Sequence, residues 1–259
     1  MSTLSQSRRE FLKGTLLLSA GAVGTSSCGP ASRVVEASSF MPRVMLGGDS
    51  ITMSIQFMVM SNLFGTTEVW PNSYFNLGRS ETLARVLSGG CEFFSPDLLT
   101  YFDVLYLSGM GIHDTYSHDE FGAEIDPLSA ERYEEVWRGI IETIQAINPR
   151  ATTIVATVTQ FSPPRADAWN TASVDGYNEV IKRLATQYDR LSICDLRQVQ
   201  ADQGLEAEQY DGVHFTEVGA QILATEATES INLALSASAD QQRQARPSLE
   251  QILRFAESI

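Results

Sequence analysis

Short apolar runs and longer amphipathic segments alternate along the chain from residue 43 onward. The runs are almost continuously hydrophobic and rich in β-branched residues, which is typical of strands buried on both faces. They cover residues 43–48, 73–78, 102–109, 151–159 and 191–196. Segments with helical spacing cover residues 50–64, 81–88, 129–148, 175–188 and 216–235. This alternation predicts an α/β fold, a three-layer α/β/α sandwich around a central, mostly parallel sheet of about five strands.

The segment 129–148 has the clearest helical pattern. Ser129 can cap its first turn, and Pro149 follows its last residue. Its apolar positions recur three and four residues apart, so we expect them to face the sheet. They are Val136, Ile140, Ile141 and Ile144.

The first 28 residues have the features of an export signal. Arg8 and Arg9 precede a modest apolar run and then small residues, and the run is too short to span a membrane. The pattern S-R-R-x-F-L-K resembles twin-arginine signals, which direct folded proteins across a bacterial membrane. An ordinary secretory signal and an amphipathic N-terminal helix are the alternatives. The favoured interpretation predicts an exported protein of the periplasm or cell envelope.

Cys28 ends this segment and resembles a bacterial lipoprotein site, although Thr25 stands where such sites usually have Leu. If Cys28 is lipidated, the lipid is the membrane anchor. Residues 29–41 predict a tether, and residues 42–235 predict one α/β domain. A shift in composition marks residues 236–259 as a tail with one short amphipathic helix.

The charge excludes some partners. With 18 basic and 32 acidic residues, the net charge is −14, whereas nucleic-acid binding needs clustered Lys and Arg. Cys91 and Cys194 lie near apolar stretches and are expected to be separate buried thiols. Because the chain has no C-x-x-C pair or Cys/His cluster, we expect no metal and no cofactor. The pattern predicts no oligomeric state.

Ser50 follows the first predicted strand, after two glycines and Asp49. Open α/β sheets place their chemistry at the carboxyl ends of strands, so Ser50 is a candidate nucleophile. A turn that merely contains these residues is the alternative. A nucleophilic serine also needs a base, a group that orients the base, and donors for an oxyanion.

His214 is the candidate base, since Asp211 precedes it by three residues in a loop that contains a glycine. In such a loop the carboxylate can hold one ring nitrogen while the other nitrogen faces a serine. The alternative is a simple helix start with Thr216 as its cap. That alternative explains Thr216 but leaves the Asp-x-x-His pair without a reason.

Four blocks in this order resemble the SGNH, or GDSL, hydrolase family, over about residues 43–235. They read Gly48-Asp49-Ser50-Ile51, then NLGRSET at 76–82, GMGIHD at 109–114 and DGVHFTEVG at 211–219. Each block alone is weak, but their order and spacing together are specific. The resemblance implies the flavodoxin-like fold of that family.

The resemblance also implies roles for individual residues. Ser50 would be the nucleophile, His214 the general base and Asp211 the group that orients it. The backbone N–H groups of Ser50 and Gly78 would bind the oxyanion. Asp49, Asn76 and Asp114 would support the turns around the site.

His113 departs from the family pattern. The third block usually reads Gly-x-Asn-Asp, and its Asn donates a hydrogen bond to the oxyanion, whereas this chain has His113 at that place. A neutral imidazole can donate one N–H, so we hypothesise that His113 is the third donor. A structural histidine is one alternative. A metal site of His113, Asp114, His118 and Asp119 is another, and a solvated acidic loop explains those residues more simply.

The leading functional prediction is hydrolysis of a carboxylic ester of a small molecule, carbohydrate or lipid through an acyl-serine. An acyltransferase or deacetylase that acts on cell-envelope carbohydrate with the same residues is the first alternative. A non-catalytic envelope protein on the same fold is the second. Four apolar residues follow Ser50 at helical spacing, and we expect them in the core rather than in an acyl pocket. They are Met53, Phe57, Met58 and Met60.

Overall fold

The computed structural model describes residues 41–71, 79–90, 95–115, 126–163 and 171–238. The chain divides into two compact units, Met1–Ser39 and Phe40–Ile259, and all described residues belong to the second. The predicted signal, Cys28, most of the tether and nearly all of the tail therefore lie outside the described residues. Cys91 and the strand expected at 73–78 lie outside them as well.

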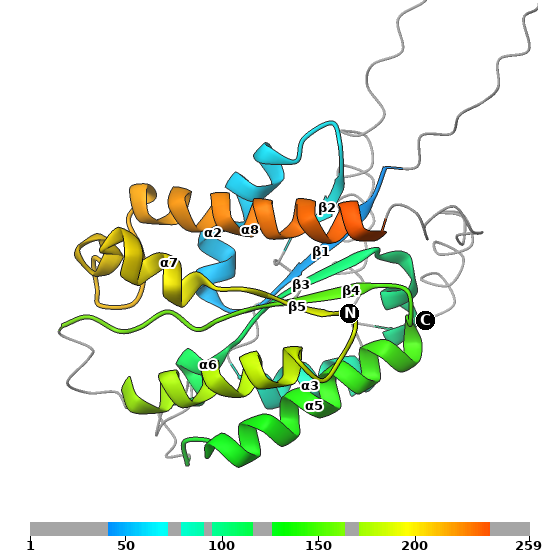
Figure 1. Ribbon diagram of the computed structural model, residues 1–259, viewed down its shortest axis with the longest axis horizontal. Helices are drawn as coiled ribbons and strands as arrows, with labels where there is room; N and C mark the ends of the chain where they lie inside the picture. The colour runs from blue at the N-terminus through cyan, green and yellow to red at the C-terminus, as the bar shows by residue number, and fades with distance from the viewer. Residues whose placement is uncertain (1–40, 72–78, 91–94, 116–125, 164–170, 239–259) are drawn as a thin grey trace, which may run out of the picture. The chain divides into compact units, whose positions relative to one another are not determined.

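The described part of the chain contains a five-stranded sheet in the order β2-β1-β3-β4-β5 (Figure 1). Every neighbouring pair is parallel. The strands are β1 (Arg43–Gly47), β2 (Glu68–Trp70), β3 (Val104–Ser108), β4 (Thr152–Ala156) and β5 (Leu191–Cys194). The predicted parallel sheet of about five strands is confirmed.

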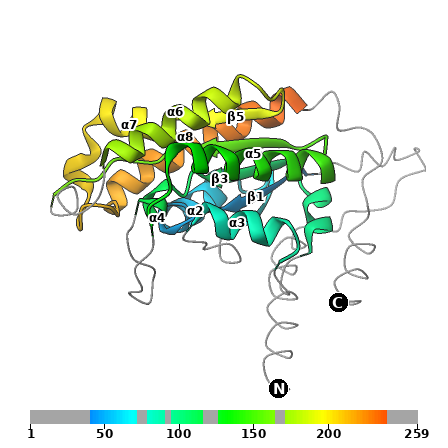
Figure 2. The same ribbon diagram turned by 90° about the horizontal axis from the view of Figure 1, so that it is seen from below.

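Helices cover both faces of this sheet (Figures 1 and 2). One face carries α2 (Ser50–Asn62), α7 (Leu196–Gln203) and α8 (Glu217–Ser238), and the other carries α3 (Ser80–Leu87), α5 (Ala130–Ile147) and α6 (Thr171–Ala185). The short α4 (Gly111–Asp114) and the 3₁₀ helices η2 (Pro96–Tyr101) and η4 (Leu205–Glu208) complete the described elements. No helix in the described ranges is both long enough and apolar enough to cross a membrane.

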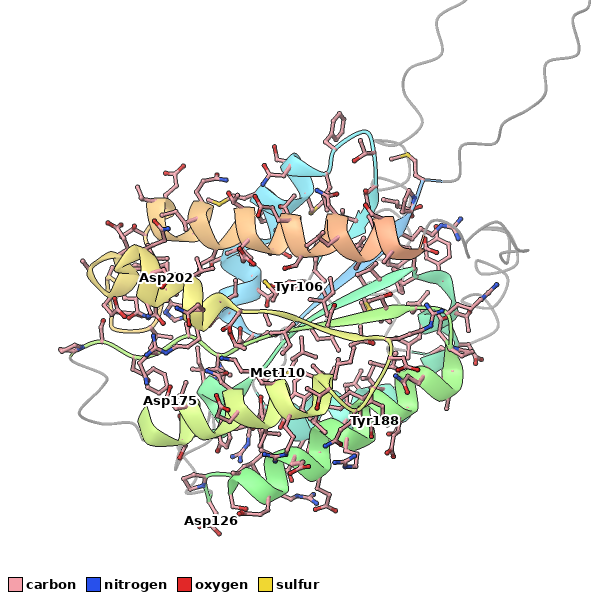
Figure 3. The ribbon with its side chains drawn as sticks, viewed as in Figure 1. Tyr106, Met110, Asp126, Asp175, Tyr188 and Asp202 are labelled. Atoms are coloured by element: carbon pink, nitrogen blue, oxygen red, sulfur yellow. The ribbon has the colours of Figure 1, made fainter. Side chains whose placement is uncertain are left out.

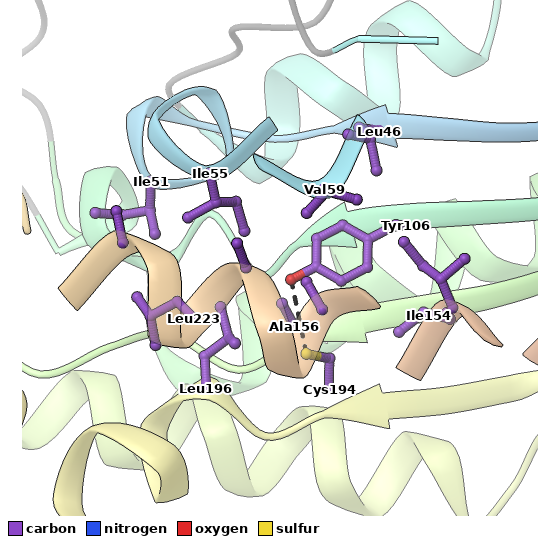
Figure 4. Close-up of a cluster of buried hydrophobic side chains, with 14 of the residues drawn as sticks. Leu46, Ile51, Ile55, Val59, Tyr106, Ile154, Ala156, Cys194, Leu196 and Leu223 are labelled. Carbon is purple, nitrogen blue, oxygen red and sulfur yellow. Dashed lines mark hydrogen bonds between the residues drawn. The ribbon is translucent and has the colours of Figure 1, made fainter. Parts of the chain in front are cut away.

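Each face of the sheet has its own hydrophobic core, because successive side chains of a strand point to opposite faces. Leu46 and Tyr106 pack toward α2 and α8, where Figure 4 shows them with Ile55 and Leu223. Met45 belongs to the core on the side of α5 and α6. A fully buried side chain of this size contributes about 1.5–3 kcal/mol, so both cores hold the strand ends in place.

The helix predicted at 129–148 is present as α5, and its cap is confirmed. The side chain of Ser129 accepts a hydrogen bond from the backbone N–H of Arg132 at 3.2 Å. The apolar face predicted for this helix is buried. These signals are local, so the sequence was sufficient to find them.

Several element ends differ from the predictions. β4 ends at Ala156 rather than residue 159, since the N–H of Val158 donates to the side chain of Asn178 at 2.7 Å and not to a neighbouring strand. β5 ends at Cys194 because the carboxylate of Asp195 caps α7, which was not predicted. The sequence did not predict β2, because its three residues are all half-buried and show no alternation of apolar and polar positions. α8 continues to Ser238, past the expected domain end at 235.

The expectation that the residues after Ser50 pack in the core is wrong for Met53 and Phe57. Their exposed fractions are 40% and 69%, whereas Ile55 is 1% exposed. Helix α2 buries Ile51, Thr52, Ile55, Gln56 and Val59 instead. Apolar residues occur on both faces of α2, so hydrophobicity alone does not show which face packs against α8.

The burial of α2 predicts opposite effects for two neighbouring substitutions. Ile55→Ala should lower the free energy of unfolding by about 2–5 kcal/mol, because it leaves a cavity between α2 and α8. Phe57→Ser should change it by no more than about 0.5 kcal/mol, because that side chain is exposed. Urea denaturation of both variants checks this. Equal losses in the two variants would contradict the burial pattern.

Candidate active site

The predicted site residues gather at the carboxyl edge of the sheet. β1 leads into α2 and Ser50, and β3 leads into α4 and His113. β1 lies between β2 and β3, so the strand order reverses beside it. In open α/β sheets, ligands bind outside the carboxyl ends of the strands at such a switch point.

The turn between β1 and α2 presents Ser50 at a helix N-terminus. Asp49 caps α2, and its carboxylate accepts the N–H of Ile51 at 3.0 Å. A Cβ at position 48 would lie 2.5 Å from the Cβ of Ser108, so only glycine allows β1 and β3 to approach this closely. Ser50 itself is half-buried.

Asp211 and His214 form a hydrogen-bonded loop before α8. One oxygen of Asp211 accepts the backbone N–H groups of Val213 at 2.9 Å and His214 at 2.8 Å. The other oxygen lies 2.7 Å from Nδ1 of His214. Gly212 has a φ of 86°, a left-handed conformation that glycine adopts without strain. The loop therefore fixes the carboxylate against one side of the imidazole.

The opposite ring nitrogen of His214 reaches Ser50. Its Nε2 lies 2.8 Å from Oγ of Ser50, although the two residues are 164 positions apart. With a proton on Nδ1 facing Asp211, Nε2 is free to accept the hydroxyl proton of Ser50. The structure thus brings together the three residues that the sequence proposed as nucleophile, base and orienting acid.

The electrostatics of the loop favour an ionised Asp211. Partial burial raises the pKa of its carboxyl, but the hydrogen bonds from His214 and Val213 outweigh this and hold the pKa below its usual value. A negative charge therefore faces Nδ1 at neutral pH. This charge stabilises a positive imidazole when His214 takes up a proton.

The helix start capped by Thr216, which was the alternative interpretation of this segment, is compatible with the Asp211–His214 pair. Thr216 does accept the N–H of Gly219 at the start of α8, at 3.5 Å. Its hydroxyl also donates to the carboxylate of Glu208. Thr216 therefore anchors the helix, while Asp211 and His214 face Ser50.

The oxyanion side of the site is only partly described. Gly78 and Asn76 lie outside the described residues, so their roles stay predictions. His113 is half-buried in α4, at the end of β3 next to the strand that leads to Ser50. Its position at this edge is compatible with a donor role.

Asp114 connects α4 with the start of α3. Its carboxylate is fully buried, and each of its two oxygens lies 3.3 Å from the backbone nitrogen of Ser80, whose N–H they accept. One of these oxygens also lies 3.4 Å from Nε of Arg79. Burial raises the pKa of Asp114 to about 7, although the bonds to Ser80 and the charge of Arg79 oppose the shift. The sequence suggested a supporting role, and the structure supplies its partners.

The proposed metal alternative gains no support from the described residues, which contain no group of three acidic, His or Cys ligands. His118 and Asp119 lie outside the described ranges, so this hypothesis stays untested there. Cys194 is a buried free thiol as expected, and burial raises its pKa to about 12.

Two neighbours of the site were not found from the sequence. The ring of Tyr210 stacks on His214 with centroids 6.0 Å apart, and the carbonyl of Gly212 accepts the N–H of Ser162. Both contacts brace the His214 loop. Neither belongs to a recognisable motif: Tyr210 lies just before the Asp211–His214 segment, and the contact of Ser162 depends on how two segments distant in sequence meet.

Comparisons with known proteins show similarity to one hydrolase family model and to several solved esterase structures. Residues 97–222 match the model of the GDSL-like Lipase/Acylhydrolase family. No curated protein matches the chain. A carbohydrate esterase family 3 from Talaromyces cellulolyticus superposes with a TM-score of 0.58 at 20% identity, over 76% of this chain and 99% of that chain.

Two further structures have the same fold. The acetyl xylan esterase AlAXEase has a TM-score of 0.57 at 17% identity, over 73% of this chain and 99% of its own. The lipase/acylhydrolase from Enterococcus faecalis has a TM-score of 0.55 at 18% identity, over 74% of this chain and 95% of its own. The fold is therefore that of the SGNH hydrolases.

The family match, together with the esterase and lipase neighbours, supports an ester-hydrolysing enzyme over the non-catalytic alternative.

The buried carboxyl of Asp114 predicts a pH effect on stability. Because its pKa is raised to about 7 in the folded state, the folded state binds more protons than the unfolded state between about pH 4 and pH 7. The free energy of unfolding of the native protein, relative to Asp114→Asn, should therefore fall as the pH rises through that range and then level off. Urea denaturation at several pH values measures the difference, and a constant difference would contradict the prediction.

Proposed function

We propose that this enzyme hydrolyses carboxylic esters through an acyl-serine intermediate formed on Ser50. The observation that carries the proposal is the continuous chain of contacts from Asp211 through His214 to Ser50, at 2.7 and 2.8 Å. These distances are those of a nucleophile, a base within hydrogen-bond reach and a carboxylate that orients the base. The family match over residues 97–222 supports the same chemistry.

In the proposed reaction, Oγ of Ser50 attacks the ester carbonyl while Nε2 of His214 takes the hydroxyl proton. The carbonyl oxygen becomes an oxyanion, which the N–H groups of Ser50 and Gly78 and the ring of His113 stabilise. His214 then gives its proton to the departing alcohol. In the second half, water releases the acid from Ser50 with His214 again as base.

The substrate proposed is an ester of a small molecule or a carbohydrate. Two of the structural neighbours are named as a carbohydrate esterase and an acetyl xylan esterase, which supports the carbohydrate class by analogy. The net charge of −14 disfavours a polyanionic substrate, because like charges repel at long range.

We also propose that the enzyme acts outside the cytoplasm of a bacterium. The twin-arginine-like segment with Arg8 and Arg9 supports export, and Cys28 offers an attachment point for lipid. Mass spectrometry of the mature protein tests both ideas, since a cleaved and lipidated Cys28 would add a defined mass.

Substitution of the proposed nucleophile tests the central idea. Ser50→Ala should lower turnover of p-nitrophenyl acetate by about 10⁴-fold or more, as removal of a triad member does, and should abolish labelling by a fluorophosphonate. Far-UV circular dichroism and unfolding curves confirm that the variant folds. Turnover equal to that of the native enzyme would show that Ser50 is not the nucleophile.

The proposed donor role of His113 predicts a graded result. His113→Ala should lower kcat by about 10²–10³-fold, the cost of one lost oxyanion donor. His113→Asn should recover much of this loss, because an Asn side chain also offers an N–H. Steady-state kinetics on p-nitrophenyl acetate compares the two variants. Native rates in both would mean that His113 donates nothing to the reaction.

A further inference from the structure

The turn that carries His113 begins with a strained residue. Met110 has φ 54° and ψ 1°, a left-handed conformation, and it is the only non-glycine residue with positive φ in the described part of the chain. It is fully buried between Gly109 and Gly111. Such strain persists only where the surrounding structure over-determines it, and it is often found at functional sites.

Tyr133 of α5 holds the entry to this turn. Its hydroxyl donates to the carbonyl of Gly109 at 2.5 Å. The N–H of Gly109 donates to Ala156 of β4 at 2.8 Å, and the N–H of Met110 donates to Oγ of Ser108 at 3.1 Å. Both the N–H and the carbonyl of Gly109 are therefore hydrogen-bonded, which fixes the orientation of the backbone just before Met110.

Tyr177 of α6 holds the exit. Its hydroxyl lies 2.5 Å from the carbonyl of Leu128 and 3.2 Å from that of Asp114, and the N–H of Leu128 also donates to Asp114. A Cβ at position 111 would lie 2.8 Å from Cδ2 of Tyr177, so the ring packs directly on Gly111. The turn therefore has no room to relax on this side.

The two tyrosines form one unit. Their rings stack with centroids 4.2 Å apart and an angle of 19° between the planes. They share a core with Met110 on the side of the sheet covered by α5 and α6, where Figure 3 labels Met110. Burial raises the pKa of both hydroxyls, so each keeps the proton that it donates.

We propose that Tyr133 and Tyr177 are positioning residues for the oxyanion side of the site. Their hydroxyls hold the carbonyls on either side of the strained Met110 turn, and this sets the direction of the following residues, which include His113. The proposal rests on the proposed function, because it assumes that the α4 turn faces the oxyanion. Neither tyrosine belongs to a block that resembles the hydrolase family.

Loss of a positioning residue should change kcat and KM in different ways. A displaced turn misaligns a donor in the transition state but leaves ground-state binding of a small ester nearly intact. The loss should therefore appear in kcat and equally in kcat/KM, with little change in KM. Misplacement of a catalytic group by a fraction of an ångström costs about 10-fold or more, since about 1 Å can cost 10²-fold.

Phenylalanine substitutions test this, because they keep the stacked rings and remove only the hydroxyls. Tyr133→Phe and Tyr177→Phe should each lower kcat for p-nitrophenyl acetate by about 10-fold, and the double variant by more, with KM within about three-fold. Tyr106→Phe is the matched control. Tyr106 is also fully buried and donates to Sγ of Cys194 at 3.7 Å, on the opposite face of the sheet (Figure 4).

A spectroscopic readout separates positioning from simple loss of stability. The chain has three histidines, so the imidazole ¹⁵N spectrum has three sets of signals, and His113→Asn identifies one of them. In both tyrosine variants the His113 signals should shift while those of His214 stay, and Tyr106→Phe should move neither. Native kcat in folded Tyr133→Phe and Tyr177→Phe, or a loss as large in Tyr106→Phe, would overturn the proposal.

The same experiment keeps the two proposals apart. If the native protein shows no Ser50-dependent turnover, the proposed function fails. The ¹⁵N signals still report whether the tyrosine hydroxyls set the position of His113. If turnover depends on Ser50 but the signals of His113 do not respond to either hydroxyl, only the positioning proposal fails.

Discussion

The contact between Nε2 of His214 and Oγ of Ser50, at 2.8 Å, joins segments 164 residues apart, and the proposed chemistry depends on it. One partner lies at the end of the first strand, and the other lies in the loop before the last described helix. Their separation is set by α2 packing on α8 over a shared core. A shift of an ångström in that packing would break the hydrogen bond, because its strength falls steeply with distance and angle.

The two sides of the site are held by different means. On the side of His214, Asp211 bonds to its own loop, so a short segment with one left-handed glycine creates most of the local geometry. On the side of His113, the geometry comes from α5 and α6, whose tyrosines reach the turn after β3. Asp114 then connects this turn to Ser80 at the start of α3. The Asp211–His214 loop and the turn held by the two tyrosines both lie at the carboxyl edge of the sheet.

The sequence predicted well wherever the signal was local or periodic. The apolar runs gave four of the described strands, and the cap and apolar face of α5 were found correctly. Where two faces of one helix are both apolar, the same reasoning failed. Met53 and Phe57 are exposed although their spacing fits a core stripe, because only the position of α8 decides which face of α2 is covered.

The sequence by itself determined the fold class and named Ser50, Asp211 and His214, since each lies in a short pattern with a chemical reason. Only the tertiary structure decided that these side chains meet, that Asp114 is buried against Ser80, and that Tyr133 and Tyr177 clamp the Met110 turn. The physical reason is range. Capping, turns and amphipathic periods are encoded within a few neighbouring residues, whereas close approach, burial and its effect on pKa depend on which distant elements pack together.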